Sequence, residues 1–262
     1  MSVIDEIIED MEKDKEIVKS FVPKSTLPKN IFDVDNGKSV LNAEVRKKML
    51  EITEEFIDFV GVNFFIYDII FIGSLANYNW SEYSDVDIHI LIDYDEFDES
   101  ENKDLVVYHQ IVQEFFDVKR RLWNETTDIK IKGYEVEMYV QDVDDKYVAT
   151  GVYSILNNEW IVEPKKIESA FDIDEKKILE KSEEYAKEVE RLEDLNKKGQ
   201  DVSKEIKTLK DKLKKFRQSG LEKGGEYSYE NLTFKLLRRN GFIEKLFNIK
   251  SSIRNKKLSL PQ

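Results

Sequence analysis

The sequence predicts an α+β protein in which a mixed β-sheet flanked by helices precedes a C-terminal helical hairpin. Between residues 65 and 163, short apolar runs alternate with polar residues at the period of a strand, and one long helical pattern interrupts them. From about residue 174 onward, apolar residues recur at helical spacing among many charges. We therefore expect residues 1–165 to hold N-terminal helices and a sheet domain, and residues 166–262 to form a helical region.

Two helices are predicted ahead of the sheet. Apolar side chains recur at near-helical spacing over residues 3–20 and again over residues 42–59. A proline-containing connection separates the two patterns. The second helix should pack on the sheet, because the first central strand is expected directly afterwards, over residues 65–72.

The rest of the sheet domain follows from alternation and turn residues. A second strand is predicted from Asp85 to Asp93, then an acidic loop over residues 94–104 and a helix over residues 105–124. Two hairpins should follow, one turning at Lys132-Gly133 and one at Asn157-Asn158, since these residues tolerate the positive φ of tight turns.

The C-terminal region should contain a pair of helices joined by a break at residues 198–201. Glycines 220, 224 and 225 are expected to loosen the chain before a last helix over residues 230–246. The tail over residues 249–262 is expected to be partly mobile.

Composition excludes several kinds of site. The 262 residues include no cysteine, which rules out disulfides and thiolate metal ligands, and only two histidines, which argues against a histidine zinc site. The acidic N-terminus lacks the apolar core of a signal peptide, and no stretch reaches the length of a membrane span. We expect a cytoplasmic protein without a membrane partner.

Charge is unevenly distributed along the chain. The net charge is −13, yet residues 203–262 carry 16 basic and 6 acidic side chains. An acidic body argues against general affinity for nucleic acid, while the basic end leaves room for a local contact with an anion. A solvated helix surface explains the basic end as well as a binding role does.

The predicted strand from Asp85 to Asp93 places two carboxylates on one face. Asp85 and Asp87 share one parity with His89, whereas the isoleucines and Val86 take the other. Two adjacent carboxylates repel each other unless a cation lies between them. A hard divalent ion such as Mg2+ takes oxygen ligands and often binds through one or two carboxylates plus substrate phosphates. A solvated acidic pair on an exposed strand is the alternative interpretation.

Gly73 and Ser74, at the end of the preceding strand, supply groups suited to a phosphate. Glycine permits close approach of an anion to the backbone, and Ser74 offers a hydroxyl. A helix beginning at Leu75-Ala76-Asn77 would direct free N–H groups at the same anion. These residues predict a metal-assisted phosphate site.

Gly73-Ser74, a ten-residue spacer and Asp85-x-Asp87 in an apolar strand resemble the signature of the DNA polymerase beta-like nucleotidyltransferase superfamily. The GSLANYNW and YSDVD segments, together with the C-terminal motif from Ser219 to Leu232, are similar to predicted nucleotidyltransferases of tailed bacteriophages. The narrower resemblance would place the protein in the cytoplasm of a host cell.

The superfamily resemblance implies a nucleotidyltransferase-type sheet and a transfer reaction. An NMP would move from an NTP to an acceptor hydroxyl with release of pyrophosphate, assisted by two Mg2+ ions, with Mn2+ as an alternative. Asp85 and Asp87 would bind the metal, and Gly73 and Ser74 would contact the phosphates. One of the cations Lys119, Arg120 and Arg121, which also complement the dipole of their helix, could reach the triphosphate.

The resemblance also implies a third carboxylate on a later strand. Glu137 is our choice, with Glu135 on the same strand face as the alternative, and an ion pair with Lys130 or Lys132 is the structural interpretation of either. An RNA 3′ end is the first choice of acceptor because of the basic C-terminal segment; a protein hydroxyl or a small molecule is the alternative. A non-catalytic nucleotide-binding or interaction protein with the same fold is the competing function.

Overall fold

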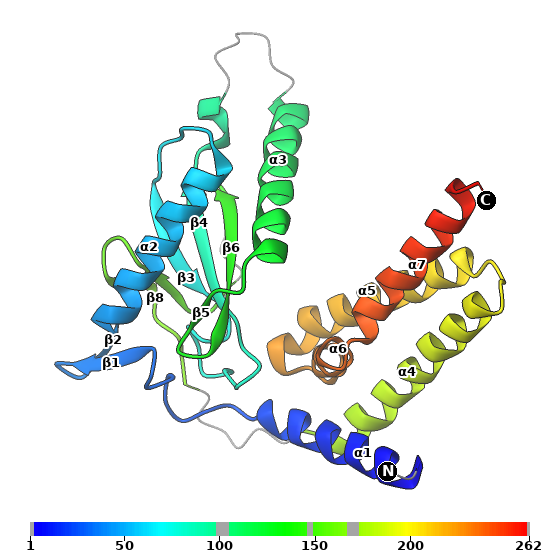
Figure 1. The fold of residues 1–262 in the computed structure, drawn as a ribbon. Coiled ribbons are helices and arrows are strands. Elements are labelled where there is room, and N and C mark those ends of the chain that lie inside the picture. The colour runs from blue at the N-terminus through cyan, green and yellow to red at the C-terminus, as the bar shows by residue number, and fades with distance from the viewer. Residues whose placement is uncertain (1–2, 98–104, 146–148, 167–172, 261–262) are drawn as a thin grey trace. The chain divides into compact units, whose positions relative to one another are not determined.

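The computed structural model describes residues 3–97, 105–145, 149–166 and 173–260. The chain divides into two compact units. Residues 23–170 form one, called here the sheet unit, and residues 1–22 with 171–262 form the other, called the helical unit. A mixed sheet with flanking helices and a separate set of C-terminal helices confirms the predicted α+β class (Figure 1).

The N-terminal helix α1 (Val3–Ser20) forms as predicted but groups with the C-terminal helices, not with the sheet. Its last turns bury Ile17 and Val18 completely, in an apolar cluster with Ile178 and Leu232. Helical periodicity showed that α1 has an apolar stripe, but many surfaces can cover such a stripe. The sequence therefore grouped residues 1–165, whereas the structure begins the sheet unit at residue 23.

The sheet unit contains a small two-stranded sheet and a six-stranded one. Its elements are β1 (Phe32–Asp35), β2 (Lys38–Leu41), α2 (Ala43–Val60), β3 (Asp68–Ile72), β4 (Val86–Ile92), the 3-10 helix η1 (Tyr94–Phe97), α3 (Leu105–Thr126), β5 (Lys130–Ile131), β6 (Tyr134–Asp142), β7 (Val152–Ser154) and β8 (Glu159–Val162). The larger sheet has the order β5-β6-β4-β3-β7-β8. Strand β4 lies antiparallel to β3 and parallel to β6, so the sheet is mixed.

Local sequence explains the ends of these elements. The Asn42 side chain caps α2 by accepting hydrogen bonds from the backbone of Glu44 and Val45, and Gly61 ends the helix in the left-handed conformation. Both predicted hairpins are confirmed. Lys132 and Asn158 adopt φ values of 52° and 58° in their turns.

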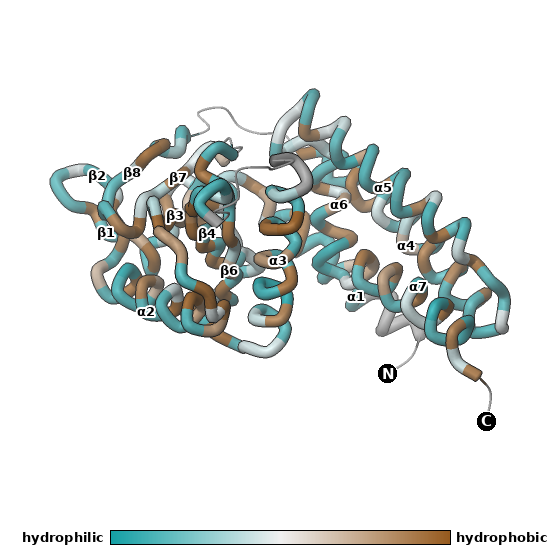
Figure 2. The backbone as a smooth tube through the Cα atoms, turned by 90° about the horizontal axis from the view of Figure 1, so that it is seen from above, coloured by the Kyte–Doolittle hydropathy of each residue, from teal (hydrophilic) through white to brown (hydrophobic). Residues whose placement is uncertain are grey.

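The six-stranded sheet has two chemically different faces. Residues Val86, Ile88 and Ile90 of β4 are fully buried in the main core, beneath the apolar stripes of α2 and α3. Figure 2 shows hydrophobic residues gathered in the central strands. The intervening residues of β4, Asp87 and His89, are only half-buried on the opposite face. The period-2 pattern thus separates a core face from a polar face.

The helical unit contains α4 (Glu175–Lys197), α5 (Ser203–Gly224), the 3-10 helix η2 (Gly225–Tyr227), α6 (Tyr229–Arg239) and α7 (Phe242–Leu258). Helices α4 and α5 form the predicted hairpin. Two other expectations for this region were wrong, because Gly220 lies buried within α5 and the last predicted helix is divided at Gly241. The segment that was expected to be partly mobile is helical as far as Leu258, in α7.

Two further segments differ from the expected pattern. The first central strand, β3, begins at Asp68 and not at residue 65. The acidic loop begins with the short helix η1, and its remainder, residues 98–104, lies outside the described residues. Over the ranges that the structure describes, no helix has the length and apolarity needed to cross a membrane.

Candidate functional site

Two of the three predicted carboxylates lie at neighbouring positions on the polar face of the sheet. In the parallel pairing of β4 with β6, Asp87 is the register partner of Glu137. Both are half-buried. Asp85 precedes β4 by one residue, is also half-buried and shares the parity of Asp87. Sheet topology therefore brings together residues that are about fifty positions apart in the sequence.

Gly73 is required by the position of Asp87. At φ +84°, an added Cβ would lie 1.9 Å from Oδ2 and 3.0 Å from Cγ of Asp87. A side chain at position 73 would therefore displace the Asp87 carboxylate. The sequence had explained this glycine by the approach of a phosphate, whereas the structure shows an approach by the protein's own carboxylate.

The loop after Gly73 is not the helix that the sequence predicted. Residues 73–79 form successive bends and turns, so the expected N-terminal turn of N–H groups is absent from this segment. The Ser74 hydroxyl donates to Ser84 Oγ at 2.7 Å, and the Ser81 N–H donates to the same oxygen at 3.0 Å. Ser84, which is 6% exposed, thus fixes the loop directly before Asp85. Ser84 directly precedes Asp85 in the sequence, and this position next to the aspartate pair could have indicated its role in the loop.

Tyr139 orients the Glu137 carboxylate. Its hydroxyl donates to Glu137 Oε2, and its ring stacks on His89 with centroids 4.5 Å apart. Burial, followed by the bond to Glu137, raises the pKa of Tyr139 well above its ordinary range, so the hydroxyl remains a donor. The sequence analysis missed Tyr139, although it lies two residues after Glu137 on the same strand face.

His89 contributes no positive charge to this face at neutral pH. Burial, together with the positive charge of Arg120, lowers its pKa to about 4, although the hydrogen bond to Gln141 acts in the opposite direction. Its Nδ1 lies 3.0 Å from Gln141 Oε1. The neutral ring serves as a stacking platform for Tyr139.

Of the three cations near the end of α3, Arg120 is the one that reaches the polar face. Its guanidinium lies 4.6 Å from the centroid of the Tyr139 ring, while Lys119 contacts the rings of Phe59 and Phe115. Arg120 also forms an ion pair with Asp117 at 3.3 Å, and its buried Nε has no hydrogen-bond partner. Because this Nε is enclosed by protein, contact of Arg120 with a ligand would depend on its terminal N–H groups.

Glu135, the alternative third ligand, occupies a different environment from Glu137. Its side chain is 69% exposed and lies 3.7 Å from the Lys130 ammonium. This is the cross-strand ion pair that the structural interpretation predicted, because Lys130 and Glu135 are register partners. The geometry therefore favours Glu137 as the neighbour of Asp87.

The carboxylates of Asp85, Asp87 and Glu137 are suitable ligands for a hard cation, but in this structure their side chains do not converge on one point. Carboxylate oxygens on adjacent strands are the ligand type that Mg2+ or Mn2+ prefers. Among the described residues, no group of three or more His, Cys, Asp or Glu side chains is close enough to hold a metal ion. Asp87 and Glu137 are nevertheless register partners on adjacent strands.

Comparison with known proteins matched no family model and no curated protein. One solved structure, a STING-associated CdnE c-di-GMP synthase from Capnocytophaga granulosa, has 13% sequence identity to this chain and a TM-score of 0.21. The match covers 83% of this chain and 84% of that chain. A TM-score this low does not establish a shared fold, and the chemistry of the site is interpreted from its own residues.

Proposed function

We propose that the sheet unit is a Mg2+-dependent nucleotidyltransferase that moves an NMP from an NTP to an acceptor hydroxyl. The observation that carries the proposal is the pairing of Asp87 with Glu137 on one sheet face, beside a loop whose glycine makes room for the Asp87 carboxylate. Two carboxylates on neighbouring strands can share a bound cation, which would favour their charged forms.

In the proposed reaction the acceptor oxygen forms a bond to the α-phosphorus, and the bond from that phosphorus to the β-phosphate bridging oxygen breaks. Asp85, Asp87 and Glu137 would hold Mg2+, which, when bound, lowers the charge barrier to attack and stabilises the leaving pyrophosphate. Glu137, oriented by Tyr139, would also accept the proton of the acceptor hydroxyl. Backbone and hydroxyl groups at Gly73 and Ser74 would contact the phosphates.

Arg120 is the side chain best suited to meet the triphosphate. It lies on the Tyr139 ring. Guanidinium groups bind phosphate oxygens through several directed N–H groups. Arg120→Lys would keep the charge and lose that geometry, so it should weaken NTP binding more than it alters the fold.

The acceptor in the proposal is an RNA 3′ end, with a protein hydroxyl or a small molecule as alternatives. The basis for RNA is the excess of basic residues in the segment 203–262. Incubation with each labelled NTP, MgCl2 and either total RNA or cell lysate would show where the label goes. Label on a protein band, with RNA unlabelled under all four nucleotides, would show that the acceptor is a protein and not RNA.

Asp87→Asn tests the reaction itself. The substitution removes a charged ligand with little change in volume, and we expect NTP turnover to be abolished while the far-ultraviolet circular dichroism spectrum is unchanged. Full turnover in this variant would refute the metal assignment. Comparing Glu137→Gln with Glu135→Gln then identifies the third ligand, because only one of the two should lose activity.

A non-catalytic nucleotide-binding protein is the second candidate. It is favoured by a specific observation: within the described part of the chain, no three carboxylates are gathered for a metal, and Tyr139 already occupies an oxygen of Glu137. Such a protein would bind NTP in equilibrium dialysis without releasing pyrophosphate under any of the acceptor conditions above.

A further inference from the structure

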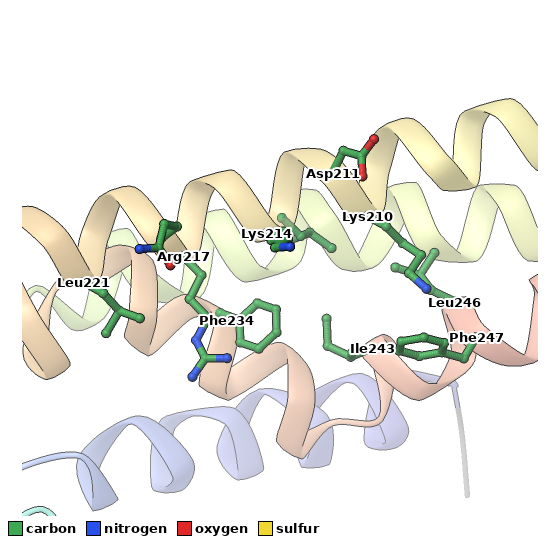
Figure 3. A pocket seen from close by; sticks show the side chains of 11 residues that line it. Lys210, Asp211, Lys214, Arg217, Leu221, Phe234, Ile243, Leu246 and Phe247 are labelled. Atoms are coloured by element: carbon green, nitrogen blue, oxygen red, sulfur yellow. The ribbon is translucent and has the colours of Figure 1, made fainter. Parts of the chain in front are cut away.

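The helical unit contains a cavity of about 500 Å³ whose walls come from α5, α6 and α7. This volume is within the range of small-molecule binding sites. Figure 3 shows the Lys210 and Arg217 side chains reaching from α5 toward the rings of Phe247 and Phe234. The cavity lies within one compact unit and is separate from the carboxylates of β4 and β6.

The floor of this cavity is the hydrophobic core of the helical unit. Leu213 and Leu246 are 3% and 1% exposed, and Phe234 and Ile243 pack against the same core cluster. Phe247 is 53% exposed, which is unusual for a phenylalanine that borders a core. The cavity therefore has an exposed aromatic side chain, Phe247, beside leucines that are buried in the core.

Three cations line the cavity along one face of α5. Lys210, Lys214 and Arg217 follow one another at spacings of four and three residues, which places them on the same side of a helix. The Lys210 ammonium lies 3.4 Å from the centroid of the Phe247 ring, and the Arg217 guanidinium lies 4.8 Å from that of Phe234. Asp211 is the one acidic residue that lines the same cavity.

Several other lysines on these helices pair with carboxylates, for example Lys212 with Glu188 and Lys257 with Asp201. Within the described ranges, Lys210, Lys214 and Arg217 have no carboxylate within ion-pair distance. Burial and the nearby Lys250 lower the pKa of Lys210, so this positive charge is held where it is unfavourable. An anion in the cavity would compensate for that cost.

We infer that this cavity binds a small amphipathic anion, with an aliphatic body packed on Leu213, Ile243 and Leu246 and a carboxylate or phosphate head between Lys210 and Lys214. Two observations select this class over a nucleic acid. Six of the eleven lining residues are apolar, and each of the two rings among them already carries a cation on one face, which leaves less ring surface for stacking with bases. The inference is independent of the reaction proposed for the sheet unit.

Isothermal titration calorimetry of the full chain with laurate tests the inference, because laurate combines an aliphatic body with a single anionic head. Dodecyltrimethylammonium, with the same chain and a cationic head, is the matched ligand control. We expect laurate to bind at least ~10-fold more tightly than the cation, since the cavity lysines attract a carboxylate head and repel an ammonium head.

Lys210→Met and Lys214→Met retain most of the aliphatic stem while removing the charge, and each should weaken laurate binding about fivefold or more. Lys207→Met is the control, because Lys207 is exposed on the same helix and does not line the cavity. Equal affinity for laurate and the cationic ligand would overturn the inference, as would equal weakening by Lys207→Met.

A final arm uses a ten-nucleotide single-stranded RNA and an acidic peptide as competitors. If neither competitor displaces laurate, the result supports a site for a small anion. Tight binding of the RNA or the peptide, lost in Lys210→Met and Lys214→Met, together with failure of laurate to bind, would assign the cavity to that macromolecule instead. Circular dichroism of each variant establishes that the helices remain folded.

Discussion

Two polar clusters in this molecule differ in how their charged groups are paired. At the corner between α5 and α6, Asn231 is fully buried and accepts a hydrogen bond from Arg217 Nε at 3.2 Å while donating to the Glu226 carbonyl at 2.7 Å. Glu226 in turn pairs with Lys235 at 2.8 Å. We call these four residues the corner network. On the sheet face, by contrast, Asp87 is paired in register with Glu137, and Asp85 is close in sequence.

The difference separates a structural cluster from a candidate reactive one. In the corner network, donors face acceptors and positive charges face negative ones, so the arrangement stabilises the fold without a ligand. On the sheet face, carboxylates occupy neighbouring strand positions, which is an arrangement expected where a protein holds groups for a cation. The comparison can be tested by removing members of each cluster and measuring stability in the absence of metal.

The largest effect is expected for Asn231→Ala. The substitution would leave Arg217 Nε and the Glu226 carbonyl without their buried partner, and we expect a loss of about 2–4 kcal/mol in the free energy of unfolding. Urea denaturation followed by circular dichroism measures it. Asn248→Ala, at an exposed position on α7, is the control and should change stability by less than ~0.5 kcal/mol. Equal effects of the two substitutions would contradict the structural role of the corner network.

Gly73→Ala should have the next largest effect. The new Cβ would force the Asp87 carboxylate away, and the alanine would keep the unfavourable positive φ of position 73. We expect a total loss of about 2–3 kcal/mol in the free energy of unfolding. Gly133→Ala is the matched control, since Gly133 has φ +93° and nothing within 4 Å of an added Cβ. The control therefore measures the backbone penalty alone. If both variants lose the same stability, contact with Asp87 is not what requires glycine at position 73.

These two sites also show what the sequence could predict. The strand containing Asp87 and the hairpin containing Glu137 follow from period-2 alternation and turn residues, so the shared polar face was predictable. Their parallel pairing in register was not, because it depends on which strands become neighbours in the sheet. A helix was predicted after Ser74 because its N–H groups would suit a phosphate, whereas a hydrogen bond from Ser74 to the hydroxyl of Ser84, ten residues later, holds a turn there.

The C-terminal motif was similarly ambiguous. Its glycines suggested a flexible connection, yet Gly220 lies within α5, where a larger residue would not fit because an added Cβ would lie 2.5 Å from the Glu230 Cβ. Helix periodicity does not show such close contacts between helices, and the same limit applied to α1, whose apolar stripe fitted either unit. Local pattern predicted the elements, while long-range packing determined their partners.

Glu226→Gln should have a smaller effect that depends on pH. Burial disfavours the charged form of Glu226, but Lys235, with Arg217 and Asn231, outweighs burial and holds its pKa below the ordinary value of 4.5. The folded state thus binds fewer protons than the unfolded state, and the stability from Glu226 is present above pH 4.5 and lost as pH falls through the folded pKa. Because the side chain is 47% exposed, we expect at most ~1 kcal/mol at pH 7. Parallel stability curves for variant and wild type between pH 7 and 3 would contradict this account.

The smallest effect on stability, and the most informative, is expected for Glu137→Gln. The amide keeps the volume, and its oxygen can still accept the Tyr139 hydroxyl, while the like-charge repulsion with Asp87 disappears. Without metal, the variant should therefore be as stable as wild type or more stable by up to ~0.5 kcal/mol. Added MgCl2 should raise the unfolding temperature of wild type but not that of the variant, since a ligand stabilises only the state that binds it. A variant that is less stable without metal would place Glu137 in the same class as Glu226, with its charge stabilised by the hydrogen bond from the Tyr139 hydroxyl.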